Sequence, residues 1–276
     1  MDRCLLCNKE VPVRFTHADR RFMVCGDCNF GFYDRDVAAD VAAHFTTFQY
    51  DHDPDEILRH SGWKRAIEDI RALKPDGVFV DIGCQFGEFL RALAPYPYER
   101  VGLEISTACI EYLKANNLAD TIYDRDLLAL DVADESWDIV TMWNVLDLLL
   151  QPLETLQRLQ RILKPDGLLV IRLPNLSFHL PVKKLCNTLH IRDPSVLHDT
   201  MYSVRSLRLI LERCGYQVIR IGPSPLSDRD PSQFGHQRLH IRAGKAAMQI
   251  LGWFTSIASG GRSTVHPSII AYARKP

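Results

Sequence analysis

The sequence predicts an α/β fold in which a doubly wound, seven-stranded, mostly parallel sheet carries a small cysteine-rich unit at its N-terminal side. Three observations support this prediction. Apolar strand segments alternate with helical segments from residue 78 onward. The stretch Val78–Leu90 has the pattern of a strand, a glycine turn and a helix. Four of the eight cysteines form two Cys-x-x-Cys pairs before residue 29.

The alternation is regular enough to place each element of the expected sheet. Strands are expected at 78–82, 100–104, 121–123, 137–142, 168–173, 216–221 and 268–274. Helices are expected at 86–94, 106–116, 152–163 and 204–214. Because strands and helices alternate, most strands should run parallel, with helices on both faces.

The composition is that of an ordinary globular protein. The 276 residues include 33 basic and 34 acidic ones, so no overall charge would attract nucleic acid or an anionic membrane. No apolar run approaches the roughly 18–20 residues that span a bilayer. The start of the chain lacks the pattern of a secretory signal, and a cytoplasmic protein is expected.

Residues 1–33 are bounded by cysteines. Cys4-x2-Cys7 and Cys25-x2-Cys28 flank alternating segments that suit a short hairpin. A unit this small cannot bury enough surface to fold alone, and four thiolates on one tetrahedral Zn²⁺ supply the missing stability. We therefore predict a structural zinc ribbon, with a redox dithiol pair as the alternative. The remaining cysteines are expected to be small core residues: Cys84, Cys109, Cys186 and Cys214.

Two further segments surround the expected sheet. Residues 34–77 should form a helical linker or lid, with helices at 36–45 and 55–73, before a larger domain over 78–276. Trp63, within this linker, is expected to be a core residue.

Three acidic residues lie at or just after the ends of consecutive expected strands. Asp81 ends the first strand, Glu104 ends the second, and Asp126 follows the third. In doubly wound sheets ligands bind beyond the carboxyl ends of the strands, and Glu104 has the spacing of a carboxylate that accepts hydrogen bonds from a ribose diol. Asp126 is suited to accept a hydrogen bond from an exocyclic amine of a purine.

The turn after the first strand differs from a dinucleotide-binding turn. The spacing is D-x-G-x-x-x-G, with glycines at Gly83 and Gly87, rather than G-x-G-x-x-G. An acid at Asp81 is badly placed for a pyrophosphate but well placed for a ligand that bears an ammonium group and no phosphate. S-adenosylmethionine (SAM) is such a ligand.

Several segments, in order, resemble the class I SAM-dependent methyltransferases. They are VDIGCQFG at 80–87, GLEIS at 102–106, Asp126-Leu127, SWDIV at 136–140, ILKPDGLLVI at 162–171, LILERCGYQV at 209–218 and IIAYARKP at 269–276. The resemblance covers about 60–222 and recurs at the last strand. It implies a Rossmann-like methyltransferase fold over 78–276, SAM as the cofactor, and a last strand that inserts antiparallel.

The resemblance also implies which residues contact the cofactor: Asp81, Gly83, Cys84, Gln85, Gly87, Glu104, Ile105, Asp126, Leu127 and Trp143. Two positions depart from the family pattern. Gln85 replaces the middle glycine of the turn, and Leu148 stands where relatives often carry a histidine. If the protein uses a general base, the base must then come from elsewhere, and His198, in a loop that borders the substrate cleft of related enzymes, is the candidate. Capping of the helix at 204–214 is its alternative role.

The segment 236–259 is expected to be a helix inserted before the last strand. One end is basic, with Arg242 and Lys245 among its residues, and the other end is apolar, with Trp253 and Phe254. Such a helix suits a membrane surface or a lipid-like substrate. Packing over the active-site cleft or at a dimer contact is the alternative.

Three functions follow from these observations. The first is methyl transfer by SN2 displacement from SAM to a small-molecule acceptor, such as a sugar, a lipid or a secondary metabolite. The second is a methyltransferase that holds protein or RNA with its zinc ribbon, which the near-neutral charge disfavours for RNA. The third is a binding module without catalysis, which the departures at Gln85 and Leu148 keep open.

Overall fold

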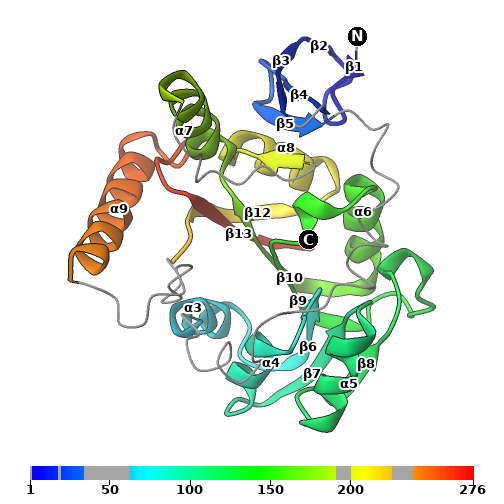
Figure 1. The fold of residues 1–276 in the computed structure, drawn as a ribbon. Helices are drawn as coiled ribbons and strands as arrows, with labels where there is room; N and C mark the ends of the chain where they lie inside the picture. The colour runs from blue at the N-terminus through cyan, green and yellow to red at the C-terminus, as the bar shows by residue number, and fades with distance from the viewer. Residues whose placement is uncertain (1, 18–19, 34–62, 191–199, 226–238) are drawn as a thin grey trace.

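The computed structural model describes residues 2–17, 20–33, 63–190, 200–225 and 239–276 (Figure 1). They form a large sheet with helices on both faces and a smaller sheet near the N-terminus. The large sheet consists of β6 (Gly77–Ile82), β7 (Tyr98–Leu103), β8 (Thr121–Tyr123), β9 (Trp137–Trp143), β10 (Leu163–Pro174), β12 (Gln217–Pro223) and β13 (Ser268–Arg274). All seven expected strands are confirmed, and β10 begins earlier than expected.

The strand order contains one reversal in the direction of winding. It is β12-β13-β10-β9-β6-β7-β8, and β13 runs antiparallel to both of its neighbours. The expected antiparallel insertion of the last strand is therefore confirmed. The chain proceeds from β6 through β7 to β8 on one side and then crosses to β9 on the other side of β6. The direction of winding thus reverses beside β6, and ligands bind at such a switch point.

Successive residues of a strand point to opposite sides of the sheet. Because apolar residues lie on both sides, both faces of the sheet are covered by helices. Phe79 packs in one core with the helices of the first face, and Val80 packs in the other core with those of the second. The first face carries α3 (Lys64–Leu73), α4 (Glu88–Leu93) and α5 (Thr107–Ala115), and the second carries α6 (Pro152–Ile162) and α8 (Val204–Arg213). The doubly wound architecture is therefore confirmed.

The N-terminal unit is a small antiparallel sheet that a strand from the larger domain completes. Its order is β11-β5-β4-β3. The members are β3 (Val13–His17), β4 (Arg20–Val24), β5 (Phe30–Tyr33) and β11 (Thr200–Tyr202), and β1 (Asp2–Arg3) pairs separately with β2 (Glu10–Val11). The expected hairpin between the cysteine pairs is confirmed as β3–β4. The sequence did not predict β11, because three residues are too few to show an alternation.

Side-chain contacts add to this shared sheet. Arg213 Nη1, on α8, donates a hydrogen bond to the backbone oxygen of Leu6 at 2.7 Å. The rings of Phe30 on β5 and Tyr202 on β11 lie 5.1 Å apart between their centres. The N-terminal unit is thus braced against the larger domain rather than tethered to it by a single chain connection.

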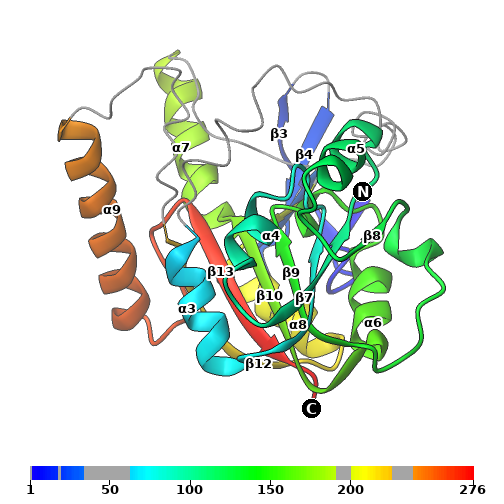
Figure 2. The same ribbon diagram turned by 90° about the horizontal axis from the view of Figure 1, so that it is seen from below.

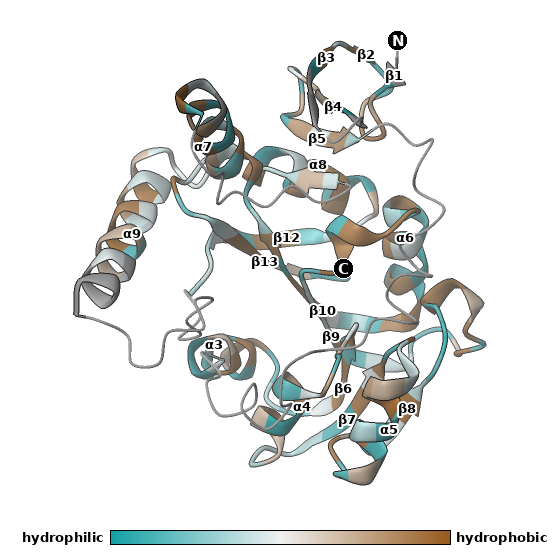
Figure 3. Ribbon diagram, in the orientation of Figure 1, coloured by the Kyte–Doolittle hydropathy of each residue, from teal (hydrophilic) through white to brown (hydrophobic). Residues whose placement is uncertain are grey.

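Two helices, α7 (Leu176–Leu189) and α9 (Leu239–Ala258), lie at one side of the large sheet in both views (Figures 1 and 2). α9 confirms the helix expected at 236–259. α7 was not expected, because Pro181 within it interrupts a helical pattern. Figure 3 shows apolar residues along both helices. None of the helices in the described part of the chain has the length and hydropathy needed to span a bilayer.

The linker expected at 34–77 is described only in its last part. α3 confirms the C-terminal portion of the helix expected at 55–73. The helix expected at 36–45 lies outside the described residues.

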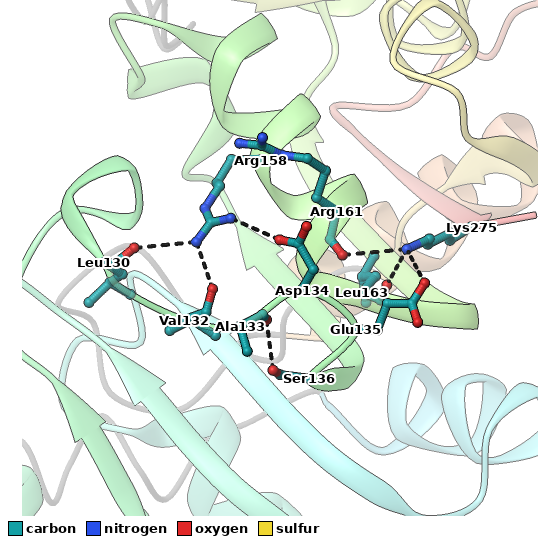
Figure 4. A network of polar contacts seen from close by, with 10 residues as sticks. All are labelled: Leu130, Val132, Ala133, Asp134, Glu135, Ser136, Arg158, Arg161, Leu163 and Lys275. Atoms are coloured by element: carbon teal, nitrogen blue, oxygen red, sulfur yellow. Dashed lines mark hydrogen bonds and ion pairs between the residues drawn. The ribbon is translucent and has the colours of Figure 1, made fainter.

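A network of polar contacts holds the segment before β9 against α6 and the end of the chain (Figure 4). Arg158 donates to the backbone oxygen of Val132 at 2.7 Å and pairs with Asp134 at 3.1 Å. Lys275 Nζ donates to the backbone oxygen of Leu163 at 2.7 Å. This network lies at the amino ends of β9 and β10. It therefore stabilises the sheet at the edge opposite the predicted site.

Candidate functional site

The carboxyl ends of neighbouring parallel strands bring the predicted acidic residues to one edge of the sheet. Asp81 lies near the end of β6, Glu104 directly follows β7, and Asp126 follows β8. Asp81 is in register with Gly102 of β7 and with Thr141 of β9. These three acids therefore surround the switch point beside β6.

The carboxyl group of Asp81 is buried, and burial raises its pKa to about 8. Thr141 Oγ1 donates a hydrogen bond to Asp81 Oδ1 at 2.6 Å and lowers this pKa, whereas the charge of Glu104 raises it. A positive charge beside such a carboxyl group stabilises its ionised form. The position therefore fits the ammonium group of an amino-acid ligand.

Glu104 is also buried, and backbone N–H groups hold its carboxylate in place. Oε1 accepts hydrogen bonds from Ile105 at 2.8 Å and Ser106 at 2.9 Å, and Oε2 accepts one from Gln85 at 2.8 Å. A carboxylate offers about four acceptor sites, so Oε2 retains one. A ribose hydroxyl fits that site, and a second hydroxyl would have to replace the bond from Gln85.

The turn between β6 and α4 contains three residues in the left-handed region: Gly83 at φ 66°, Gln85 at φ 49° and Gly87 at φ 74°. A Cβ atom on Gly83 would lie 2.6 Å from Val145 Cγ2, and one on Gly87 would overlap Leu113. Both glycines are therefore needed for packing as well as for conformation. Gln85 takes up the left-handed conformation at a cost of roughly 1–2 kcal/mol. The departure from glycine at this position therefore leaves the turn intact.

Asp126 caps η2 (Leu127–Ala129), a short 3-10 helix. Its Oδ1 accepts a hydrogen bond from the backbone N–H of Leu128 at 2.8 Å. The side chain is exposed, so Oδ2 is placed to accept a hydrogen bond from a ligand amine.

Besides Asp81 and Glu104, two further predicted cofactor residues, Cys84 and Leu127, have buried side chains. Cys84 packs against Gly102, where an added Cβ would lie 2.9 Å from its Sγ. Leu127 is part of the core that lies under α6. Contacts from Cys84 to a ligand at the strand edge therefore have to come from its backbone.

Trp143, at the end of β9, belongs to an aromatic cluster beside the turn. Its ring centre lies 4.7 Å from those of Phe89 and Trp63. The indole N–H groups of Trp63 and Trp143 are buried and have no hydrogen-bond partner among the described residues. Unpaired buried donors are rare in native proteins, so each of these N–H groups is a candidate donor to a ligand acceptor such as a carboxylate. Trp63 was expected to be a core residue, and its position within the expected lid at 34–77 was the signal that could have identified it.

Arg172, at the carboxyl end of β10, was not identified from the sequence. Its partly buried guanidinium donates to Asn144 Oδ1 at 2.7 Å, Ser268 Oγ at 3.0 Å and Ser224 Oγ at 3.1 Å. Burial lowers the pKa of Arg172, and the charge of Asp147 raises it. The side chain therefore fixes the segment after β9 next to the switch point. A single arginine in an apolar strand carries no sequence pattern that would have indicated this.

The four cysteines of the N-terminal unit converge on one point. Their Sγ atoms all lie within 4.8 Å of one another, with 3.5 Å between Cys4 and Cys28 and 3.5 Å between Cys7 and Cys25. Tetrahedral Zn–S bonds of about 2.3 Å separate the sulfur atoms by about 3.8 Å, so the cluster fits a zinc ion. The hydrogen bond with Cys28 lowers the pKa of Cys4 to about 5 and raises the pKa of Cys28.

The backbone adopts the same conformation around each of the two cysteine pairs. The N–H of Asn8 donates to the oxygen of Cys4, and the N–H of Asn29 donates to the oxygen of Cys25, each at 2.9 Å. Both asparagines adopt left-handed conformations, at φ 58° and 54°. Asparagine tolerates this region better than most residues. The repeated Cys-x-x-Cys-Asn sequence therefore forms two equivalent turns that present the thiols to each other.

His198, the candidate general base, lies outside the described residues. The described chain resumes two residues after His198, at β11. There Thr200 Oγ1 donates a hydrogen bond to the backbone oxygen of Asp147 at 3.1 Å. This contact joins the shared small sheet to the segment after β9.

Residues 50–221 match the sequence family described as a methyltransferase domain. The match spans more than half of the chain and leaves out the cysteine-rich unit and α9. No curated protein matches the chain in sequence.

Solved structures share the fold at low sequence identity. A methyltransferase in complex with the Trm112 activator of Haloferax volcanii is 20% identical, with a TM-score of 0.55 over 80% of this chain and 92% of that one. A SAM-dependent methyltransferase from Mesorhizobium loti is 17% identical, with a TM-score of 0.53 over 79% and 99%. A third, from Thermotoga maritima, is 17% identical, with a TM-score of 0.52 over 80% and 92%.

Proposed function

The chain belongs to the family of SAM-dependent methyltransferases, and from this premise we propose that it transfers the methyl group of SAM to a small-molecule acceptor. The observation that carries the proposal is the arrangement at the switch point. The buried carboxyl of Asp81, the carboxylate of Glu104 and the left-handed turn at Gly83–Gly87 lie together at the carboxyl edge of the sheet.

Each end of the cofactor has a matching group at this edge. Asp81 is proposed to bind the ammonium group, Glu104 the ribose and Asp126 the adenine amine. The unpaired indole N–H groups of Trp63 and Trp143 are proposed to donate to the carboxylate of the methionine portion. Bound in this way, SAM supplies a methyl group that its sulfonium activates for displacement.

The protein's main contribution to such a displacement is alignment. Holding donor and acceptor at the correct distance and angle supplies much of the rate enhancement. Arg172 keeps the segment after β9 in place, and Thr141 orients the Asp81 carboxyl group. We retain His198 as the proposed general base for an acceptor that must lose a proton.

The placement of the N-terminal unit supports a small acceptor. Its β5 edge is already paired with β11, and its Leu6 carbonyl accepts a hydrogen bond from Arg213. The unit therefore uses this side to brace the domain rather than to hold a macromolecule. We propose that one structural Zn²⁺ bound by the four converging thiols stabilises this brace.

Labelled methyl groups can test the acceptor class. The zinc-loaded protein is incubated with cell extract and SAM that carries a radioactive methyl group, and the products are separated into small molecules, lipids, protein and RNA. We expect label in the small-molecule or lipid fraction. The variant Glu104→Ala, tested at the same SAM concentration, should transfer far less label. Label confined to protein or RNA would overturn the proposed acceptor class, although the methyltransferase activity itself would stand.

A further inference from the structure

The second half of α9 has an apolar stripe that faces solvent. Ile250, Trp253, Phe254 and Ile257 are 56 to 70% exposed. Their spacing of i, i+3, i+4 and i+7 places them on one face of the helix. Helices of globular proteins normally bury such a stripe, so this helix is oriented with its apolar face outward.

The opposite face of the same helix packs through small and polar residues. Gly252 is buried, and a Cβ at this position would lie 2.8 Å from the ring of His266. Thr264 Oγ1 donates to the backbone oxygen of Gly252 at 2.7 Å, and the N–H of Val265 donates to Thr255 Oγ1 at 3.0 Å. These contacts fix the direction of the helix, and they hold the apolar stripe away from the core.

A helix with so little buried surface gains little stability from packing, which is the main source of helix stability in proteins. Among residues 246–258, Gly252 is the single buried position. α9 also lies outside the part of the chain that matches the methyltransferase family. Little of this helix is buried, so packing against the described residues leaves its apolar face uncovered.

The charges around the stripe indicate what that surface is. The 29 residues from 239 to 267 contain Arg242, Lys245 and Arg262 and no acidic residue. The chain has 34 acidic residues in 276, so about three or four would be expected in a segment of this length. The side chain of Arg262 is exposed. The partner of the stripe is thus expected to carry negative charge.

α7 extends the same basic and apolar character. Leu185 and Leu189 are more than half exposed, Lys184 is exposed, and residues 176–190 also lack acidic residues. The start of α7 is joined to the segment after α9, because Asn175 Nδ2 donates to the backbone oxygens of both Thr264 and His266. The two helices lie at the same side of the large sheet (Figures 1 and 2).

We propose that this face, formed by the exposed stripe of α9 and the exposed end of α7, docks the protein on the surface of an anionic phospholipid bilayer. The apolar stripe would insert between headgroups and acyl chains, and the exposed side chains of Lys184 and Arg262 would meet lipid phosphates. Trp253 and Phe254 are residue types that favour the membrane interface. A second copy of the chain fits less well, because two such faces would bring basic residues together with no acidic partner.

Vesicle binding by the full-length, zinc-loaded protein tests this proposal. The probes are phosphatidylcholine vesicles with and without phosphatidylglycerol, and the readout is co-sedimentation. We expect binding to the anionic vesicles, weaker binding as salt is added, and little binding to pure phosphatidylcholine. The double variant Trp253→Ser/Phe254→Ser should bind at least about tenfold more weakly. The matched control Val13→Ser/Ile219→Ser, which removes exposed apolar residues elsewhere, should bind like the parent protein.

Tryptophan fluorescence gives a second readout that needs no variant. Of the four tryptophans, Trp253 is 56% exposed, and lipids brominated near the headgroup should quench its emission. SAM affinity should be equal in the double variant and the parent, which shows that the variant is folded. Absence of binding to anionic vesicles would overturn the proposal. So would a stable dimer in solution in which Trp253 is protected from a soluble quencher, because a second copy would then cover the stripe.

Discussion

Asp81 is expected to release a proton when SAM binds. The pKa of its buried carboxyl group is about 8, so roughly nine in ten molecules carry the proton at pH 7. An ammonium group beside the carboxyl favours the ionised form, so binding at pH 7 should release about 0.9 proton per molecule. Affinity should rise nearly tenfold per pH unit between about pH 5.5 and pH 7, or about 1.4 kcal/mol per unit.

Calorimetric titration in two buffers with different ionisation enthalpies measures this release directly. At pH 7 the observed binding enthalpy should differ between the buffers by about nine-tenths of the difference in their ionisation enthalpies. Measurements belong below about pH 8, because the α-amino group of the ligand begins to lose its own proton there.

Two variants separate Asp81 from other titrating groups. Asp81→Asn should bind SAM weakly and without proton release. Thr141→Val removes the hydrogen bond that lowers the pKa of Asp81, so the rise in affinity should move to higher pH. Equal binding enthalpies in both buffers for the parent protein would refute the placement of the ammonium group at Asp81.

The same shift in pKa affects the stability of the free protein. The native state binds the Asp81 proton more tightly than the unfolded chain, where the pKa is near the ordinary value of 3.8. The contribution of the protonated Asp81 to the free energy of unfolding is therefore complete below about pH 4 and is lost as the pH rises through about 8.

Further predictions concern the ribose acid, the turn and the N-terminal unit. Glu104→Ala should weaken SAM binding at least tenfold, about 1.4 kcal/mol, and unchanged affinity in a titration would contradict its assignment to the ribose. Gln85→Gly should stabilise the protein by about 0.5–1 kcal/mol in urea unfolding and Gln85→Val should destabilise it by more than about 1 kcal/mol, because φ is 49° there; the reverse order would contradict the left-handed turn. Metal analysis should find one zinc per chain, and Cys25→Ser should lose it and melt at lower temperature, whereas a zinc-free parent with the same melting temperature would contradict a structural metal. Arg213→Ala should lower stability by about 1–2 kcal/mol and leave SAM affinity unchanged, and a loss of SAM affinity would contradict a purely bracing role.

Most of the large sheet could be predicted from the sequence because its signals are local. The buried parallel strand β6 contains the continuous apolar run Val78-Phe79-Val80, and each helix that follows a strand shows helical spacing. The same holds for the two cysteine pairs, whose spacing alone indicates a metal site. The left-handed conformation of Gln85 was not predictable, because glutamine carries no preference for it. It depends on the bond from its N–H to Glu104, 19 positions along the chain.

The sequence by itself determined the family, the acidic residues at the strand ends and the two cysteine pairs. Only the tertiary structure decided that β11 completes the N-terminal sheet, that the indole groups of Trp63 and Trp143 lie together, and that the apolar stripe of α9 faces outward. The physical reason is the range of the interactions. Strand and helix patterns depend on neighbours a few positions away, whereas these features depend on contacts between segments far apart in the chain. The direction of α9, for example, is set by Gly252 against His266, and no periodicity of the helix itself records that contact.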